Sequence, residues 1–188
     1  MTVRAGAAMP QLYLARFTGT RPRVRVVANE VDVEESRGSL PLSWRLKSAE
    51  FALNKSIPWD FDVRGGAWRL TADLRDLRLS MVTVDGGANR VNVRLPHPSG
   101  TILIRFGGDA SDISVSRPDG VAVRIVVHDS FYGLQVDGKT IEAANRRSFQ
   151  TAGFARQTDR YDIVVTGAAY RFVITSEPEN RQRGPIGR

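Results

Sequence analysis

The sequence predicts an all-β fold, a single-stranded β-solenoid of about six to seven rungs with about 21 residues each. One observation is a glycine-rich motif that recurs at constant spacing, with 21 residues from Gly65 to Gly86 and again from Gly86 to Gly107. Another is that the apolar residues between the motifs, many of them Val and Ile, alternate with polar ones, as in Val82-Thr83-Val84. Such alternation is typical of strands with one buried face.

Each repeat is expected to contain a strand, a glycine-rich corner, a second strand and a turn. The motif or a variant of it occupies residues 62–70, 83–91, 105–113, 126–134 and 164–172. Proline and glycine, which suit tight turns, mark closing turns at residues 96–100, 117–120 and 136–139. Stacking would align apolar residues in two inner columns, Leu70, Val91, Ile113, Leu134 and Phe172 in one and Val93, Val115, Val136 and Ile174 in the other.

The pattern divides the chain into a leader at 1–21, poorly ordered or capping, a solenoid domain at 22–175 and a disordered tail at 176–188. Weak repeats are expected near Val24–Val33 and Leu42–Leu53, and we favour a strand over a short helix at Leu46–Asn54. A loop or helical insert, with a helical turn at Ile141–Arg147, interrupts the rhythm near 139–160. Insertions in solenoids map to loops on one side.

Size and charge limit the class of protein. The chain has 188 residues, enough for one domain, and no cysteine. It lacks an apolar run of the roughly 18 residues that span a bilayer and the apolar region of a signal peptide, so we expect a cytoplasmic protein as encoded. The net charge of +7 divides into +4 at residues 1–58, +1 at 59–178 and +2 at 179–188. Because the repeat body is nearly neutral, nucleic-acid binding is not favoured, whereas contact of the basic ends with a membrane surface stays an alternative.

These motifs also resemble those of a known family. The Gly-Gly-Ala corners, the Pro-x-Gly turns and residues 158–165 resemble bacterial putative-adhesin repeat domains and the toast-rack-like C-terminal domains of membrane proteins in the cell-wall stress response. Residues 57–63 are similar to the start of such domains in actinobacterial proteins. The resemblance covers about 57–175 and, with weaker motifs, 22–56. It implies a β-solenoid for contact or regulation, with the cell envelope as the alternative location. The corner at 128–132 and the missing membrane anchor depart from the family pattern.

No catalytic, metal or cofactor site is expected. The two histidines, His97 and His128, lie in a turn and at a corner. The run His128-Asp129-Ser130 has the residue types of a hydrolytic triad, but adjacent residues on an extended chain diverge, and a triad requires convergent side chains. The acidic residues alternate with apolar ones or stand near arginines, which is typical of a solvated face. No glycine corner is followed by the Lys-Ser/Thr and helix of a phosphate loop.

One set of residues forms a candidate binding surface. At a 21-residue offset Trp68 aligns with Asn89, Ala110 and Phe131, and Tyr170 takes the equivalent place in the last rung. Arginines follow in the next column, with Tyr132 among them. Stacked arginines repel unless acids or a ligand compensate them, so either nearby Asp side chains neutralise them while the aromatics pack inward, or the set faces a partner. The candidates are Trp68, Arg69, Arg90, Phe131, Tyr132, Tyr170 and Arg171.

The predicted function is a non-catalytic structural or interaction module that presents a repetitive β surface to a protein partner or to a second copy. Open end rungs would favour self-association unless the leader and tail cap them. One alternative is a carbohydrate-binding or carbohydrate-active β-helix, which as an enzyme would need two carboxylates converging in a groove. Another is a binder of anionic polymers or membrane surfaces through the basic ends, with steep salt dependence.

Overall fold

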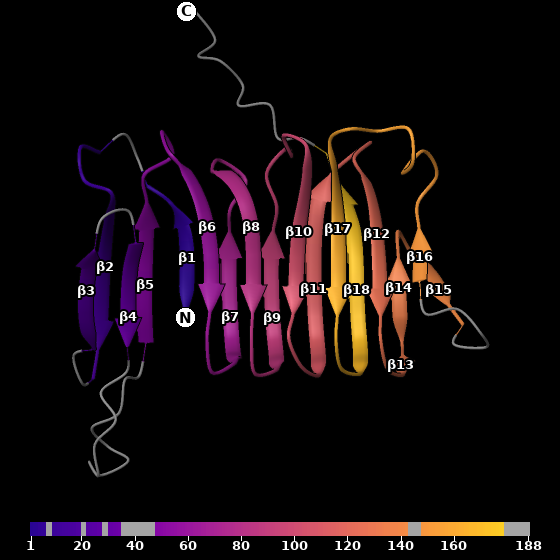
Figure 1. Cartoon of the computed structure of the whole chain (residues 1–188), viewed down its shortest axis with the longest axis horizontal. Coiled ribbons are helices and arrows are strands. Elements are labelled where there is room, and N and C mark those ends of the chain that lie inside the picture. Colours follow the sequence, from indigo (N-terminus) through magenta and orange to yellow (C-terminus); the bar gives the residue numbers. More distant parts are fainter. Residues whose placement is uncertain (7–8, 20–21, 28–29, 35–47, 143–147, 179–188) are drawn as a thin grey trace, which may run out of the picture.

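The computed structural model describes residues 1–6, 9–19, 22–27, 30–34, 48–142 and 148–178. In this part of the chain two β-sheets face each other, and the core lies between them (Figure 1). The small sheet has the order β16-β12-β17-β10-β8-β6, with bounds Ser148–Gln150, Ala122–Val127, Arg160–Val165, Thr101–Phe106, Arg78–Val84 and Pro58–Val63. The all-β solenoid predicted from the sequence is confirmed.

The large sheet has the order β15-β14-β18-β11-β9-β7-β1-β5-β2, and β13 also pairs with β18. Its strands are β15 (Lys139–Ile141), β14 (Leu134–Val136), β13 (Phe131–Tyr132), β18 (Ala169–Glu177), β11 (Ala110–Pro118), β9 (Ala88–Arg94), β7 (Ala67–Asp73), β1 (Thr2–Ala5), β5 (Ser48–Leu53) and β2 (Tyr13–Thr18).

Each complete rung runs down a small-sheet strand, turns a corner and returns along a large-sheet strand (Figure 1). Pairing between rungs is parallel, so equivalent side chains stack in columns. The predicted inner columns are buried: every member from Leu70 to Ile174 is at most 5% exposed. Burial of each large apolar side chain contributes about 1.5–3 kcal/mol, so these columns are the main source of stability.

The order of the rungs differs from the order of the repeats in the sequence. The final repeat, β17 and β18, lies between the rung of β10 and β11 and the rung of β12, β13 and β14. In Figure 1 the yellow strands of the C-terminal repeat lie within the orange part of the stack. In space the first inner column therefore reads Leu70, Val91, Ile113, Phe172, Leu134.

The first residues of the chain also lie inside the sheet. Residues 2–5, which the sequence analysis assigned to a leader, form β1 between β5 and β7, parallel to both. Val3 is fully buried there. Residues 13–18 form β2, which pairs antiparallel with β5 at the edge of the sheet. The alternation of Val3 with polar neighbours is too short to distinguish an interior strand from a terminal one, which is why the sequence pattern missed β1.

The weak repeat predicted near Val24–Val33 is not a rung. Residues Arg23–Val27 (β3) and Glu30–Glu34 (β4) pair antiparallel in a separate two-stranded sheet. Arg23 pairs with Glu34 and Arg25 with Asp32, and opposite charges directly across two strands favour this antiparallel register. Of the second weak repeat, residues 48–53 form β5, as the strand interpretation predicted, and residues 42–47 lie outside the described residues.

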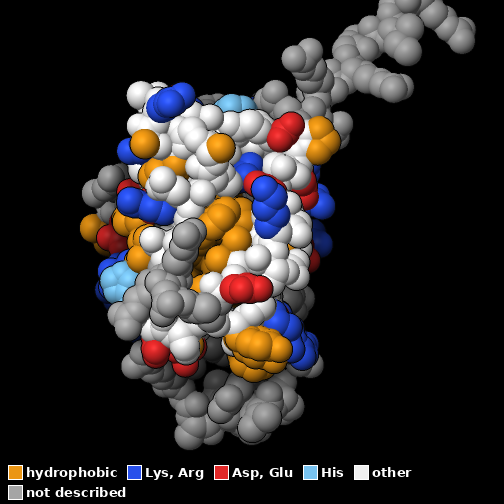
Figure 2. Space-filling view, turned by 90° about the vertical axis from the view of Figure 1, so that its right-hand side faces the viewer, with side chains coloured by type: hydrophobic (Ala, Val, Ile, Leu, Met, Phe, Trp, Pro, Cys, Tyr) orange, Lys and Arg blue, Asp and Glu red, His pale blue; other side chains and the backbone are white. Residues whose placement is uncertain are grey.

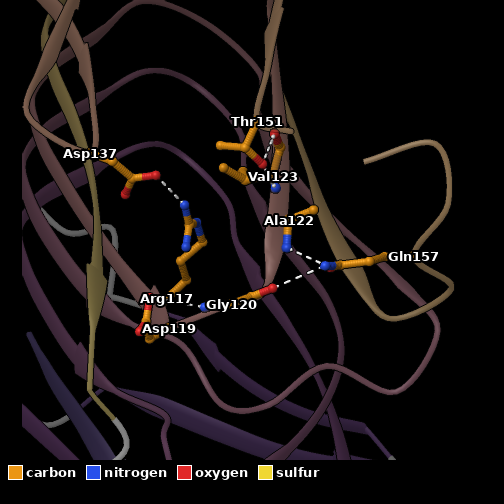
Figure 3. A network of polar contacts seen from close by, with 8 residues as sticks. All are labelled: Arg117, Asp119, Gly120, Ala122, Val123, Asp137, Thr151 and Gln157. Atoms are coloured by element: carbon orange, nitrogen blue, oxygen red, sulfur yellow. Dashed lines mark hydrogen bonds and ion pairs between the residues drawn. The ribbon is translucent and has the colours of Figure 1, made fainter. Parts of the chain in front are cut away.

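The insert near 139–160 closes one end of the stack. Strand β15 pairs antiparallel with β14, and β16 pairs antiparallel with β12. Figure 3 shows the side chain of Gln157 accepting from the Ala122 backbone N–H at 2.8 Å and donating to the Gly120 carbonyl at 3.0 Å, and Thr151 Oγ1 accepting from Val123 N–H at 2.9 Å. These bonds satisfy backbone groups of β12 at its start. The insert's described residues form strands and turns, and 143–147 of the predicted helical turn lie outside the described residues.

One charged side chain lies in the core. Arg117 of β11 is 4% exposed and forms an ion pair with Asp137 in the turn after β14 (Figure 3), while its Nε has no hydrogen-bond partner among the described residues. Strand β18 continues to Glu177, so residues 176 and 177 of the predicted tail are in the sheet, and residues 179–188 lie outside the described residues.

Two adjacent corner glycines give a matched stability test. Gly65 and Gly66 both have positive φ, at 81° and 91°, but a Cβ at Gly65 would meet nothing within 4 Å, whereas one at Gly66 would lie 2.9 Å from the Gly86 carbonyl oxygen. We expect Gly65→Ala to lower the free energy of unfolding by about 1–2 kcal/mol through backbone strain alone. Gly66→Ala should lower it by about 1–3 kcal/mol more, because the next rung must move. Urea unfolding measures both, and equal losses would contradict the close packing of the corners.

A buried tyrosine makes stability depend on alkaline pH. Tyr161 is fully buried and donates a 2.7 Å hydrogen bond to the Pro96 carbonyl, and burial raises the pKa of its hydroxyl. Since the folded state holds the proton more tightly, this stabilisation is complete below the ordinary tyrosine pKa of about 10 and is lost as the pH rises above it. We expect Tyr161→Phe to cost about 1–3 kcal/mol at pH 7 and to flatten the decline of stability above pH 10. An unchanged alkaline decline in the variant would refute this role for Tyr161.

Candidate functional site

The outer column at the corners has a different register from the one predicted. Ala67 pairs with Ala88, an offset of 21 residues, but Ala88 pairs with Ala110, an offset of 22. The additional residue lies between Arg94 and Leu103, the segment that contains the turn 96–100, because Asp73 pairs with Arg94 at 21 and Met81 with Leu103 at 22. The exposed column therefore reads Trp68, Asn89, Ser111, Tyr170 and Tyr132.

This register corrects one predicted site residue. Phe131 pairs with Ala169 and belongs to the inward column that also contains Ala67, Ala88 and Ala110. It is 9% exposed, so it is a core residue and not part of an exposed surface. Tyr132, predicted among the arginines, instead lies beside Tyr170 in the aromatic column. The constant offset of 21 was applied one turn too far.

Three aromatic side chains of this column are exposed. Trp68 is 71% exposed, Tyr132 70% and Tyr170 42%. The rings of Tyr132 and Tyr170 stack with centroids 5.5 Å apart and an angle of 16° between their planes. Figure 2 views the molecule from the β15 and β16 end and shows an exposed apolar group beside basic side chains near its lower margin. The structure thus excludes inward packing for these three residues.

The next column has an unusual backbone conformation. Arg69, Arg90, Asp112 and Arg171 have φ values of 59°, 55°, 54° and 50°, and the fifth position is Gly133 with φ 68°. Each residue follows an outward side chain and precedes an inward one, so two consecutive side chains avoid the core. This is the geometry of a bulge with a left-handed residue. It recurs in all five rungs, which keeps the ladders in register. The recurrence of Gly133 after Tyr132 is the sequence signal that could have located this column.

The charges of this column are unequally paired. Arg171 forms a bidentate ion pair with Asp112, with its Nη2 2.7 Å from Oδ2, and its guanidinium lies 4.7 Å from the centroid of the Tyr170 ring. Hydrogen bonds from Arg171 hold the pKa of the Asp112 carboxyl below its usual value. Among the described residues, neither Arg69 nor Arg90 has a carboxylate within 4.0 Å. Acidic neighbours therefore neutralise one of the three predicted arginines.

We call the two columns together the aromatic–arginine strip: Trp68, Asn89, Ser111, Tyr170, Tyr132, Arg69, Arg90, Asp112 and Arg171. The sequence predicted six of these, and it missed Asp112 and the polar role of Asn89 and Ser111. Elsewhere, His128, Asp129 and Ser130 are exposed, and their only hydrogen bonds in the described structure are backbone bonds to β17 and β18. Within the described residues there is no cluster of three or more potential metal ligands and no helix that could cross a membrane.

The fold and strip together define a class: a parallel β-solenoid with capped ends and an exposed ladder of aromatic and basic side chains. Residues 21–104 match the model of the family described as the N-terminal domain of toast_rack. The fold is similar to the crystal structure of a putative cell adhesion protein from Clostridium sporogenes, with a TM-score of 0.66, 16% identity, and coverage of 94% of this chain and 87% of that one. No curated protein matches the chain. The predicted resemblance to the toast-rack-like putative-adhesin family is confirmed.

The left-handed column allows a test of whether its side chains serve the fold. Glycine adopts this conformation without the cost of about 1–2 kcal/mol that other residues bear, although it adds about 0.5–1 kcal/mol of unfolded-state entropy. We expect Arg69→Gly and Arg90→Gly to leave the free energy of unfolding unchanged or to raise it by up to about 1 kcal/mol. Arg171→Gly should gain less, because it also loses the Asp112 pair. Thermal unfolding of the three variants measures the difference, and marked destabilisation by Arg90→Gly would show that Arg90 has a structural role.

Proposed function

We propose that this chain is a non-catalytic contact module that uses the aromatic–arginine strip to bind a partner at the cell envelope. The observation that carries the proposal is the placement of exposed apolar side chains. In residues 48–142 and 148–178, four large hydrophobic side chains are exposed, and three of them, Trp68, Tyr132 and Tyr170, share one column. Scattered exposed apolar residues are normal on a protein surface, whereas their concentration at one place marks an interaction site.

The rest of the architecture supports binding rather than chemistry. Aromatic and arginine side chains are the residues most enriched at binding hot spots, and a stack of rungs holds them on rigid strands. The described acidic side chains are solvent-facing or paired with arginines, as in Asp73 with Arg75 and Asp162 with Arg124. The envelope location rests on the similarity to a protein described as acting in cell adhesion.

Edge pairing between copies has less support. Both edges of the large sheet end in antiparallel strands, β2 and β15, and one edge of the small sheet ends in the short β16. Short or antiparallel terminal strands reduce edge-to-edge association. The face of the large sheet, where the strip lies, is therefore the favoured contact surface.

Site-specific photocrosslinking tests the proposal in the cells that make the protein. Benzoylphenylalanine would replace Trp68 or Tyr132 in the strip or, as a control, the exposed Arg105 on β10 of the small sheet. We expect crosslinked products from the two strip positions and not from position 105. Equal products from all three positions, or none from the strip, would contradict a contact role for this surface.

A further inference from the structure

We propose that the ligand of the aromatic–arginine strip is an acidic polysaccharide that lies across the strands. This inference rests on the proposed function and names the chemical class of the partner. It follows from the spacing of the aromatic rings, the polar groups between them, and two arginines whose conformation has a cost that nothing in the described structure offsets.

The aromatic rings form platforms at separated points along a flat path. Trp68 is on β7 and Tyr170 on β18, three strand spacings apart in the order β7-β9-β11-β18, and Tyr132 follows on the next strand. At about 4.8 Å per strand these platforms extend over about 19 Å. The apolar faces of sugar rings stack on exposed aromatic faces, and Tyr and Trp combine such a face with a polar group. An extended chain of several sugars would span this length.

The residues between the platforms suit the hydroxyl groups of a sugar chain. Asn89 and Ser111 lie between Trp68 and Tyr170, are half-buried, and offer amide and hydroxyl groups that donate and accept. Neither is large enough to interrupt the path. The adjacent outer column is uncharged, with the members Thr71, Asn92, Ser114, Val173 and Gln135.

The arginines specify that the chain is acidic. Arg69 and Arg90 both hold left-handed backbone conformations, at φ 59° and 55°, where glycine would fit without strain. Strain of this kind is characteristic of functional sites when it has no structural return. Arg171 has such a return in its pair with Asp112, but Arg69 and Arg90 have no carboxylate partner among the described residues. Guanidinium groups bind carboxylates in bidentate geometry, so a polymer with regularly spaced carboxylates fits this row.

The position of the strip argues against an acidic peptide. Peptides that bind β-proteins commonly add a strand to a free edge and pair through the backbone. The strip instead lies on the face of the large sheet, where the backbones of β7, β9, β11 and β18 are already paired with neighbours on both sides. Only side chains are available there, which favours a ligand recognised through rings and charges.

The test compares three polymers by isothermal titration calorimetry at fixed ionic strength. Polygalacturonate provides acidic sugar rings, its methyl ester provides the same rings without charge, and polyglutamate provides carboxylates without rings. We expect binding in the order polygalacturonate, then methyl ester, then polyglutamate. Polyglutamate binding as strongly as polygalacturonate, or no binding of polygalacturonate, would overturn the proposal.

Variants connect the binding to the strip. Arg69→Gly with Arg90→Gly, and separately Trp68→Ala, should each weaken polygalacturonate binding by about tenfold or more. The matched control is Arg105→Ala with Arg156→Ala, which removes two exposed charges outside the strip and should leave binding unchanged. Equal weakening by this control would overturn the assignment, because it would show a response to net charge alone. Photocrosslinks to a protein at positions 68 and 132, without polygalacturonate binding, would overturn the polysaccharide and preserve the contact module, whereas failure of both experiments would overturn both.

Discussion

Parallel backbone pairing between successive rungs is the constraint on which the rest of this structure depends. It places Leu70, Val91 and Ile113 in one buried column and, through the same register, Trp68, Asn89 and Ser111 in one exposed column. The left-handed residue at each corner preserves this register, since a bulge in one rung alone would misalign its neighbours. Core and surface are therefore two consequences of one alignment, and a residue added in a turn changes the surface column without changing the buried one.

The repeat pattern was sufficient to predict the solenoid and its core but not the order of the rungs. Alternation of apolar and polar residues is a local property, and Leu70, Val91 and Phe172 are inward wherever their rungs lie. The position of β17 and β18 between β10 and β12 depends on contacts across about 60 residues, from Ile104 to Ile163 and from Ile113 to Phe172. Val3 of β1 pairs with Phe51 and Ala72 at similarly long range. Periodicity contains no information about such partners.

The candidate surface was partly predictable for the same reason. Trp68, Arg69 and Arg90 precede the added residue of the turn at 96–100, so a fixed offset located them correctly. Phe131 and Tyr132 follow it, and their roles were exchanged, because neighbouring strand residues face opposite sides of a sheet. The left-handed conformation of the arginine column has no signature in residues such as Arg90, which glycine would ordinarily replace.

The intercalated strands at both chain ends have a consequence for how the molecule is completed. In most stacked-repeat proteins the terminal repeats are outer layers, and each can be removed with loss of one interface. Here β1 is bordered by β5 and β7, and β18 by β11 and the strands β13 and β14. Deletion of either terminal strand would open a slot in the middle of the large sheet and expose two strand edges at once. During synthesis the sheet stays divided until residues near 177 have emerged, so its final closure is a late event that joins the cap of the insert to the remainder of the stack.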